Sequence, residues 1–275
     1  QVIKIEPPQA GDGYRNFALM ASTPTSDVNY TSQLDHRNKR SLALNLKTEE
    51  GRKVLRQLVA ECDVYVTNTP HPMRREWGLT YEELAALNSR LIYASLTAYG
   101  ELGPERDREG FDLVAYWARS GLMDLVRAPG ADPAPAIPGM GDHPTAVSLY
   151  AAILTALFKR QQTGEGSHVH TSLLANGMWS ASCIAQGVFA EADFTLYHQL
   201  SSHLFTRLLY EAADGRWLQF SMVRTDEEVD MLLTAIGRPD LLLDPRFVTA
   251  DLRVEHGNVL VEEMKAALST ETAAH

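Results

Sequence analysis

Two aspartates stand at places where a carboxylate could take part in chemistry. Asp112 precedes an apolar run over residues 113–122, and Asp142 precedes a second apolar run. A carboxylate in either place could act as a base or as a nucleophile. Each could equally cap the helix that follows it, because aspartate is a favoured residue at a helix N-terminus. The residues alone leave both interpretations open.

Other residue types that bind metals or attack substrates form no known pattern. His168 and His170 flank one residue of an expected strand and so point to the same face, but two strand histidines without a nearby acid are usually structural. The sequence has no HExxH spacing, no Walker loop, no GxGxxG and no GxSxG. We therefore predict no metal site, and kinase, Rossmann dehydrogenase and α/β-hydrolase functions lack support.

The bulk composition is that of an ordinary globular protein. Of 275 residues, 45% are hydrophobic and 22% are charged, and the formal net charge is −10. This charge disfavours nucleic acid or an anionic membrane as the main partner. Two cysteines give no disulfide framework, and no apolar run approaches the roughly 20 residues of a membrane span. With no visible signal peptide, we predict a cytoplasmic protein.

A strand–helix–strand unit over residues 38–68 is the first element that would position chemistry. Leu42, Leu44 and Leu46 alternate with period two, as a strand would. A helix is predicted from Thr48 onward, and residues 63–67 form a second short strand. Such a unit requires parallel strands and a right-handed crossover. Ligands of these sheets bind at the carboxyl ends of the strands, here near residues 44–47 and at Asn68.

The alternation continues along the chain and then changes. We predict a helix over residues 146–161, a strand over 167–171 and a second apolar helix over 173–190. From about residue 205 a hairpin-like pair, residues 208–210 and 217–220, precedes short helices. The sequence therefore predicts an α/β protein with a large α/β domain over residues 1–200 and a small α+β domain over 201–275.

Short motifs follow one another in a fixed order: VIKIEPP at residues 2–8, WGLTYEEL at 77–84, NSRLIY at 88–93, TGEGSHV at 163–169, DGRW at 214–217 and GRPDL at 237–241. In this order they resemble the class III coenzyme A transferases, a family with formyl-CoA transferase, carnitine CoA-transferase and α-methylacyl-CoA racemase. The resemblance covers roughly residues 1–250. Because the family's chains are longer at both ends, we expect this sequence to be a fragment.

The resemblance implies a Rossmann-like parallel sheet, an interlocked dimer, and coenzyme A or acyl-CoA as substrate with no permanently bound cofactor. It also implies which residues contact CoA: Leu44, Lys47, Asn68, Thr69, Met73, Arg74, Arg75 and Trp77. Cations are needed at the phosphates of CoA. Taken singly, Lys47 and the two arginines are equally typical of a solvated surface, so that interpretation stays open.

One position departs from the family's pattern. Counting from Gly164 along the strand, the place where the family carries its nucleophilic aspartate holds Ala175, and alanine has no nucleophilic atom. The next residue, Asn176, could orient a thioester carbonyl or cap a helix. An engineered replacement, a divergent subgroup that uses another residue, and a CoA-binding subunit of a heteromeric enzyme would each explain Ala175. The resemblance places Asp112 near the thioester and Asp142 in a loop that closes over the active site.

We therefore predict a CoA-transferase that moves CoA between an acyl-CoA and a small carboxylic acid, with no nucleic acid or membrane partner. Its thioester would lie where residues 110–112 meet residues 174–176. We expect a homodimer; in the alternative, the chain is a non-catalytic CoA-binding subunit of a heterodimer. A third interpretation is an acyl-CoA isomerase or lyase with Asp112 as base. Racemization is disfavoured, because Phe111 occupies the place of the racemases' histidine.

Overall fold

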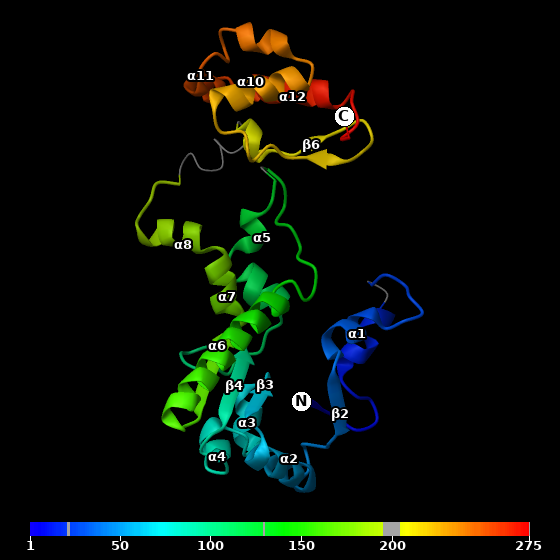
Figure 1. The fold of residues 1–275 in the computed structure, drawn as a ribbon, viewed down its shortest axis with the longest axis vertical. Helices are drawn as coiled ribbons and strands as arrows, with labels where there is room; N and C mark the ends of the chain where they lie inside the picture. Colours follow the sequence, from blue (N-terminus) through cyan, green and yellow to red (C-terminus); the bar gives the residue numbers. More distant parts are fainter. Residues whose placement is uncertain (21–22, 129, 195–203, 275) are drawn as a thin grey trace. The chain divides into compact units, whose positions relative to one another are not determined.

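The structure is a computed structural model that describes residues 1–20, 23–128, 130–194 and 204–274. The chain divides into two compact units, one formed by Gln1–Leu125 with Ala134–Ser182 and the other by Val126–Pro133 with Cys183–His275. Figure 1 shows the elements, coloured along the sequence from blue at the N-terminus to red at the C-terminus. The domain boundary that we predicted at residue 200 falls in residues 195–203, outside the described residues.

The first unit begins with two parallel strands, β1 (Val2–Glu6) and β2 (Lys39–Ala43), joined by the 3₁₀ helix η1 (Gly13–Leu19) and by α1 (Tyr30–His36). Glu6 at the end of β1 is buried, and its carboxylate accepts hydrogen bonds from the Arg15 guanidinium. The Arg15 hydrogen bonds hold the pKa of Glu6 at about 2. β2 ends at Ala43, so Leu44 and Leu46, which we predicted inside the strand, follow it.

Helix α2 (Glu49–Glu61) forms because Thr48 caps it and two acids lie in its first turn, where they complement the helix dipole. The Thr48 hydroxyl accepts a hydrogen bond from the Gly51 N–H at 3.2 Å. Gly51 is required here, because a Cβ at this residue would lie 2.1 Å from the Asn45 carbonyl oxygen. On the apolar face of α2, Leu55 and Val59 pack into a buried cluster. The predicted strand, helix and second strand are all present, but the two strands do not pair with each other, so the predicted parallel pairing within this unit is wrong.

A second parallel sheet has the order β3-β4-β5, with β3 at Val64–Thr67, β4 at Ile92–Thr97 and β5 at Ser167–Ser172. Helices α3 (His71–Trp77) and α4 (Tyr81–Ala85) connect β3 to β4. β4 is the central strand, and residues 92–95 are buried. The prediction of one Rossmann-like sheet is therefore corrected. Within the described residues the strands form two parallel sheets, because no ladder of hydrogen bonds joins β1 or β2 to β3.

Between β4 and β5 the chain forms η2 (Leu113–Ala118), a π-helix, then α5 (Leu122–Leu125) and α6 (Asp142–Thr163). Helix α7 (Leu173–Ser180) directly follows β5. α6 packs against β4 and β5. The single helix predicted over residues 173–190 is instead two helices, because α7 ends at Ser180 and α8 spans Ser182–Phe189. Gly177 lets α7 approach η2, since a Cβ there would lie 2.3 Å from the Tyr116 carbonyl oxygen.

The second unit has its own core. The predicted hairpin is confirmed as β6 (Tyr210–Glu211) paired antiparallel with β7 (Trp217–Leu218). A short 3₁₀ helix, η3 (Phe205–Arg207), precedes the hairpin. The helices after it are α10 (Asp226–Ala235), η4 (Pro239–Leu243), α11 (Ala250–Glu255) and α12 (Gly257–Leu268). Tyr210, Leu233, Leu260 and Met264 are fully or almost fully buried among them.

Candidate functional site

The three strands of the second sheet end at the same edge, because they are parallel and in register. β3 ends at Thr67, β4 at Thr97 and β5 at Ser172. The segments that follow these strands therefore begin close together, at the edge where sheets of this kind bind ligands. They contain the predicted residues from Asn68 to Trp77, Asp112, and the Ala175–Asn176 pair.

Asp112 is a structural carboxylate in this geometry. It caps η2 and is 3% exposed. One oxygen accepts a hydrogen bond from the Leu113 N–H at 2.9 Å, and the other accepts from the N–H groups of Gly139 at 2.8 Å and Gly141 at 3.1 Å. Both oxygens are thus occupied by backbone donors. The carboxylate ties the loop before α6 to the start of η2, which favours the capping role.

Asp142 differs from Asp112 although it also begins a helix. It is the first residue of α6, and its side chain has exposed surface. Surrounding protein still displaces enough water to raise the pKa of Asp142, and the nearby charges of Asp112 and Asp35 raise it further. No hydrogen bond to its carboxylate is found among the described residues. This is a carboxylate with free oxygens at the positive end of a helix of 22 residues.

Residues from η1 and α1 complete the surroundings of Asp142. His143 Nε2 lies 3.4 Å from Asp35 Oδ1. Tyr14 hydrogen-bonds to Asp35, and its pKa is raised to about 12 by burial, by that hydrogen bond and by the charges of Asp35 and Asp142. Sequence reasoning missed Tyr14, Asp35 and His143, because no local spacing links residues 14 and 35 to residue 143.

Ala175 and Asn176 lie in the first turn of α7, directly after β5. The backbone N–H of Ala175 donates to the Ser172 hydroxyl at 3.1 Å, so Ser172 caps the helix, and the Ala175 methyl is exposed. The Asn176 amide donates to the Thr171 hydroxyl and to the Ser172 carbonyl, both at 2.8 Å. Its oxygen accepts from the Ser148 hydroxyl on α6 at 2.5 Å.

Asn176 therefore holds β5, α6 and α7 together. Both amide hydrogens are already donated within the protein, so Asn176 has no N–H left for a thioester carbonyl. The packing of α7 on η2 completes the junction, with a 2.6 Å hydrogen bond between the hydroxyls of Tyr116 and Ser180. The start of α6, the start of η2 and the first turn of α7 thus belong to one packed region.

The residues predicted to contact CoA fall into two groups. Leu44 and Trp77 pack, partly buried, against the same apolar cluster as Leu55. Lys47 and Asn68 are exposed after their strands, while Thr69 and Met73 are partly buried. Among the described residues Lys47 has no ion pair, so its ammonium group is available to a phosphate.

Arg74 and Arg75 have other partners. Arg74 is 2% exposed, and its guanidinium donates to Glu101 at 2.7 Å and to the Tyr93 hydroxyl at 3.4 Å. Arg75 makes two 3.1 Å hydrogen bonds to Asp107. The phosphate role predicted for Arg74 is not supported by this geometry, because its charge is neutralised inside the protein by Glu101.

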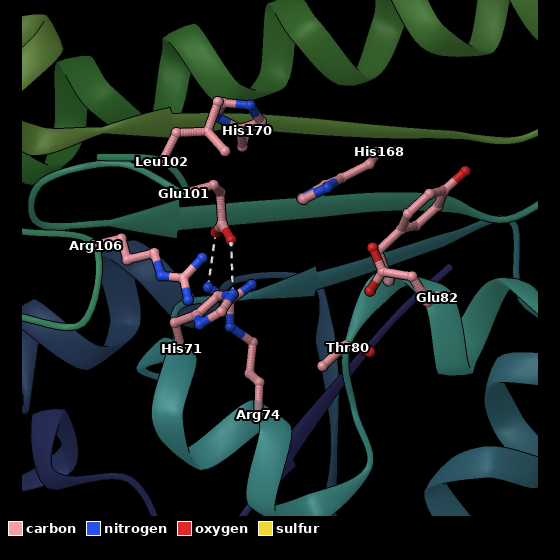
Figure 2. A pocket seen from close by; sticks show the side chains of 10 residues that line it. His71, Arg74, Thr80, Glu82, Glu101, Leu102, Arg106, His168 and His170 are labelled. Carbon is pink, nitrogen blue, oxygen red and sulfur yellow. Dashed lines mark hydrogen bonds and ion pairs between the residues drawn. The ribbon is translucent and has the colours of Figure 1, made fainter. Parts of the chain in front are cut away.

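A pocket of about 260 Å³ lies beside this buried pair (Figure 2). α3, the start of α4, β5 and the loop after β4 contribute its lining, which includes His71, Arg106, His168 and His170. The His168 ring bonds to the Ser95 hydroxyl at 2.9 Å and stacks on Tyr81 at 5.1 Å. Burial alone would raise the pKa of Glu101, but hydrogen bonds from Arg74 and Ser95 hold it below its ordinary value.

The two strand histidines do share a face, with ring centroids 5.3 Å apart. Burial lowers the pKa of His168. Over residues 1–20, 23–128, 130–194 and 204–274, no three or more His, Cys, Asp or Glu side chains are gathered as a metal ion would need. In the same ranges no helix combines the length and the apolar character needed to span a bilayer.

Comparison with known proteins places the chain in a family. The sequence pattern of CoA-transferase family III matches residues 1–275. The cinnamoyl-CoA:phenyllactate CoA-transferase of Clostridium sporogenes is 35% identical over 90% of this chain and 60% of its own length. The (R)-2-hydroxy-4-methylpentanoate CoA-transferase of Clostridioides difficile is 32% identical over 99% of this chain and 68% of its own length.

A solved structure agrees with these sequence matches. A CaiB/BaiF family protein from Brucella suis superposes with a TM-score of 0.81 at 27% identity, covering 100% of this chain and 72% of that protein. The fold, the parallel strands and the order of the motifs along the sequence thus point to the same group. The chain belongs to CoA-transferase family III.

Proposed function

We propose that this chain forms the CoA-binding and acyl-transfer site of an enzyme that moves CoA from an acyl-CoA to a small carboxylic acid. The family match over residues 1–275 carries this proposal. The geometry supports it, because Lys47 and Asn68 are exposed just after strands β2 and β3, where CoA phosphates could reach them. The first turn of α7 follows β5, at the same edge of the three-stranded sheet as Asn68.

The acceptor class that we propose is a 2-hydroxy acid with an apolar side chain. The two relatives described above are transferases named for phenyllactate and for (R)-2-hydroxy-4-methylpentanoate. Both acids carry a hydroxyl beside the carboxylate and an apolar group at the other end. A shared acceptor chemistry in two relatives that cover most of this chain supports the same chemistry here.

Asp142 is the residue that we propose as nucleophile. The methyl group of Ala175 cannot attack a thioester, and Asp112 has both oxygens bound to backbone N–H groups. Asp142 has exposed surface and begins a long helix whose dipole stabilises negative charge. Ser148, six residues further along α6, touches Asn176, so Asp142 lies about 9 Å along the helix axis from the Ala175 turn.

The transfer then runs through a covalent intermediate on this carboxylate. An Asp142 oxygen attacks the thioester carbonyl carbon, the C–S bond breaks, and CoA leaves as a thiolate. The thiolate attacks the aspartyl carbonyl of the resulting anhydride and releases the donor acid as a carboxylate. The acceptor carboxylate next attacks the aspartyl thioester and releases the thiolate again. Attack of that thiolate on the acyl carbon forms the new acyl-CoA and frees Asp142.

Two other functions are less well supported. An isomerase or lyase with Asp112 as base would need a free oxygen on a carboxylate that is buried and doubly occupied. A non-catalytic CoA-binding subunit would explain Ala175 without a substitute nucleophile. The homodimer or heterodimer expected from the family stays a prediction.

The test is turnover by the purified chain with cinnamoyl-CoA and phenyllactate, followed by separation of the CoA esters. We expect phenyllactyl-CoA to form, and to form at least about tenfold faster than the CoA ester of 3-phenylpropanoate, which lacks the hydroxyl. Asp142→Asn should lower the rate by about 1,000-fold or more, while Asp230→Asn in the second unit leaves it unchanged. No turnover by the unaltered chain would favour the CoA-binding subunit.

A further inference from the structure

One pocket of the first unit has no role in the transfer proposed above. It is lined from α3, the start of α4, β5 and the loop after β4, and we call it the histidine pocket because it contains His71, His168 and His170. The residues exposed for CoA after β2 and β3 do not line it. Its volume of about 260 Å³ is below the roughly 300–1,000 Å³ of pockets for drug-sized ligands, so a ligand here would be smaller than CoA.

Arg106 brings an incompletely neutralised positive charge to this pocket. Within the described residues its guanidinium makes no hydrogen bond, and its Nε lies 3.7 Å from an Asp107 oxygen. Asp107 already accepts two 3.1 Å hydrogen bonds from Arg75, and His71 Nδ1 lies 3.2 Å from it. One carboxylate thus faces two guanidinium groups, which leaves a net positive charge. The planar guanidinium of Arg106 matches the oxygens of a carboxylate or a phosphate.

The lining also has more nitrogen donors than the protein uses. Nε2 of His168 is bound to the Ser95 hydroxyl, but its other ring nitrogen and both ring nitrogens of His170 have no hydrogen-bond partner among the residues that the structure describes. The buried Nε of Arg74 likewise has no partner in the described part of the chain. Because buried N–H groups without acceptors are rare in native proteins, this region is short of acceptors. An oxyanion in the pocket would supply acceptor oxygens.

The two acids of the lining decide where an anion would bind. Glu101 is neutralised, because its Oε1 lies 2.7 Å from Nη2 of Arg74. Glu82, in the first turn of α4, has no ion pair among the described residues. Figure 2 shows Glu82 and Arg106 on opposite sides of the pocket. An anionic group would therefore be attracted to the side of Arg106 and repelled from the side of Glu82.

We propose that the histidine pocket binds a small oxyanion, a carboxylate or inorganic phosphate, with its negative charge beside Arg106, at a site separate from that of CoA. This inference rests on the lining residues alone and does not depend on the proposed function. The guanidinium is half-exposed and water competes for it, so the affinity should be modest. We expect a dissociation constant of about 1 mM at low salt.

Calorimetric titration of the full chain with inorganic phosphate, and separately with acetate, is the first test. Saturable binding of either anion supports the proposal, and the tighter of the two identifies the preferred oxyanion; binding of neither overturns it. Arg106→Met should raise the dissociation constant at least about tenfold, since a charge-assisted hydrogen bond is lost. Arg108→Met removes the same charge from an exposed residue of the same loop outside the lining, and should change it less than about twofold.

A change of the opposite sign tests the position of the anion inside the pocket. Glu82→Gln removes a like charge from the lining, so it should tighten binding by about threefold, whereas Glu76→Gln, at an exposed residue of α3 outside the lining, should not. Circular dichroism would show that all variants keep their helices.

A titration with phosphate in the presence of saturating CoA tests whether the two sites are separate. We expect the dissociation constant of phosphate to stay within about twofold of its value without CoA. Phosphate binding that CoA abolishes would make the pocket part of the CoA site and overturn the proposal. Binding of both anions unchanged by Arg106→Met would also overturn it, because the charge that holds them would then lie elsewhere.

Discussion

The starts of η2 and α6 can be compared directly, because each has an aspartate at the N-terminal end of a helix near the same sheet. At η2, three backbone N–H groups hold the Asp112 carboxylate inside the protein. At α6, the Asp142 carboxylate keeps its oxygens free and has exposed surface. The difference teaches that a carboxylate whose oxygens are all bound by backbone N–H groups shapes a site, whereas an exposed carboxylate with free oxygens is available to react.

The same contrast separates two cations that we had grouped together. Arg74 is buried against Glu101, whereas Lys47 is exposed at the end of the first strand–helix–strand unit. Only Lys47 is placed to exchange a water shell for phosphate oxygens. Four predictions test this division into structural and reactive charges.

Breaking the Arg74–Glu101 pair should have the largest effect on stability. Arg74→Met leaves the buried Glu101 carboxylate without its counter-ion, so the free energy of unfolding should fall by about 3–5 kcal/mol. Arg75→Met, which removes an exposed ion pair, should cost less than about 1 kcal/mol. Urea unfolding measures both. If Arg74→Met with Glu101→Gln were no more stable than Arg74→Met alone, the uncompensated charge would not be the cause.

Replacing the two aspartates should separate stability from activity. Asp112→Asn removes an acceptor and sets an amide against backbone N–H groups, which should cost about 2–4 kcal/mol of unfolding free energy. Asp142→Asn should change it by less than about 1 kcal/mol. The same urea experiment compares them. Equal losses would contradict the contrast between the starts of η2 and α6.

Removing the charge of Lys47 should weaken CoA binding without destabilising the chain. Lys47→Ala should raise the dissociation constant of CoA about tenfold, since one charge-assisted hydrogen bond to a phosphate is lost. The difference should shrink at high salt, because the pairing is exposed. Lys53→Ala on α2 is the matched control. Calorimetric titration gives the CoA dissociation constants of both variants. If Lys53→Ala raised the constant as much as Lys47→Ala, Lys47 would be an ordinary surface lysine with no special role in binding CoA.

The pH dependence of transfer should report Asp142. Burial and the charge of Asp112 raise its pKa above the ordinary 3.8, and only the ionised form can attack. The rate should therefore rise with pH through a value above 3.8 and then level off. Folding disfavours the charged form, so Asp142→Asn should become relatively more stable as pH rises through the same range. A flat profile from pH 4 to 7 would argue against Asp142.

Local patterns predicted much of this fold. Helix α2 followed from Thr48 and the acids after it, although the leucine alternation carried the preceding strand too far, to Leu46. β5 and the helix capped by Ser172 followed from a short strand before an apolar helical pattern. The division into two separate sheets was not predictable, because the sequence of a strand does not specify which other strand it pairs with. The break at Ala181 was missed because the apolar helical pattern continues through it.

The site was less predictable than the fold. Asp112 and Asp142 were identified from their places at the starts of helices. Which of the two carboxylates keeps free oxygens depends on the N–H groups of Gly139 and Gly141, which donate to Asp112. The Arg74–Glu101 pair joins residues 27 positions apart, a contact that no helical or strand period encodes. Sequence showed which residues could react, and tertiary contacts decided which of them remain available.

The most direct test of the account is the mass of the chain after incubation with cinnamoyl-CoA, followed by peptide mapping. We predict an adduct of CoA, removed by hydroxylamine, on the peptide that contains Asp142, and its loss in Asp142→Asn. An adduct on Asp112, or transfer by the chain with Asn at position 142, would contradict the account.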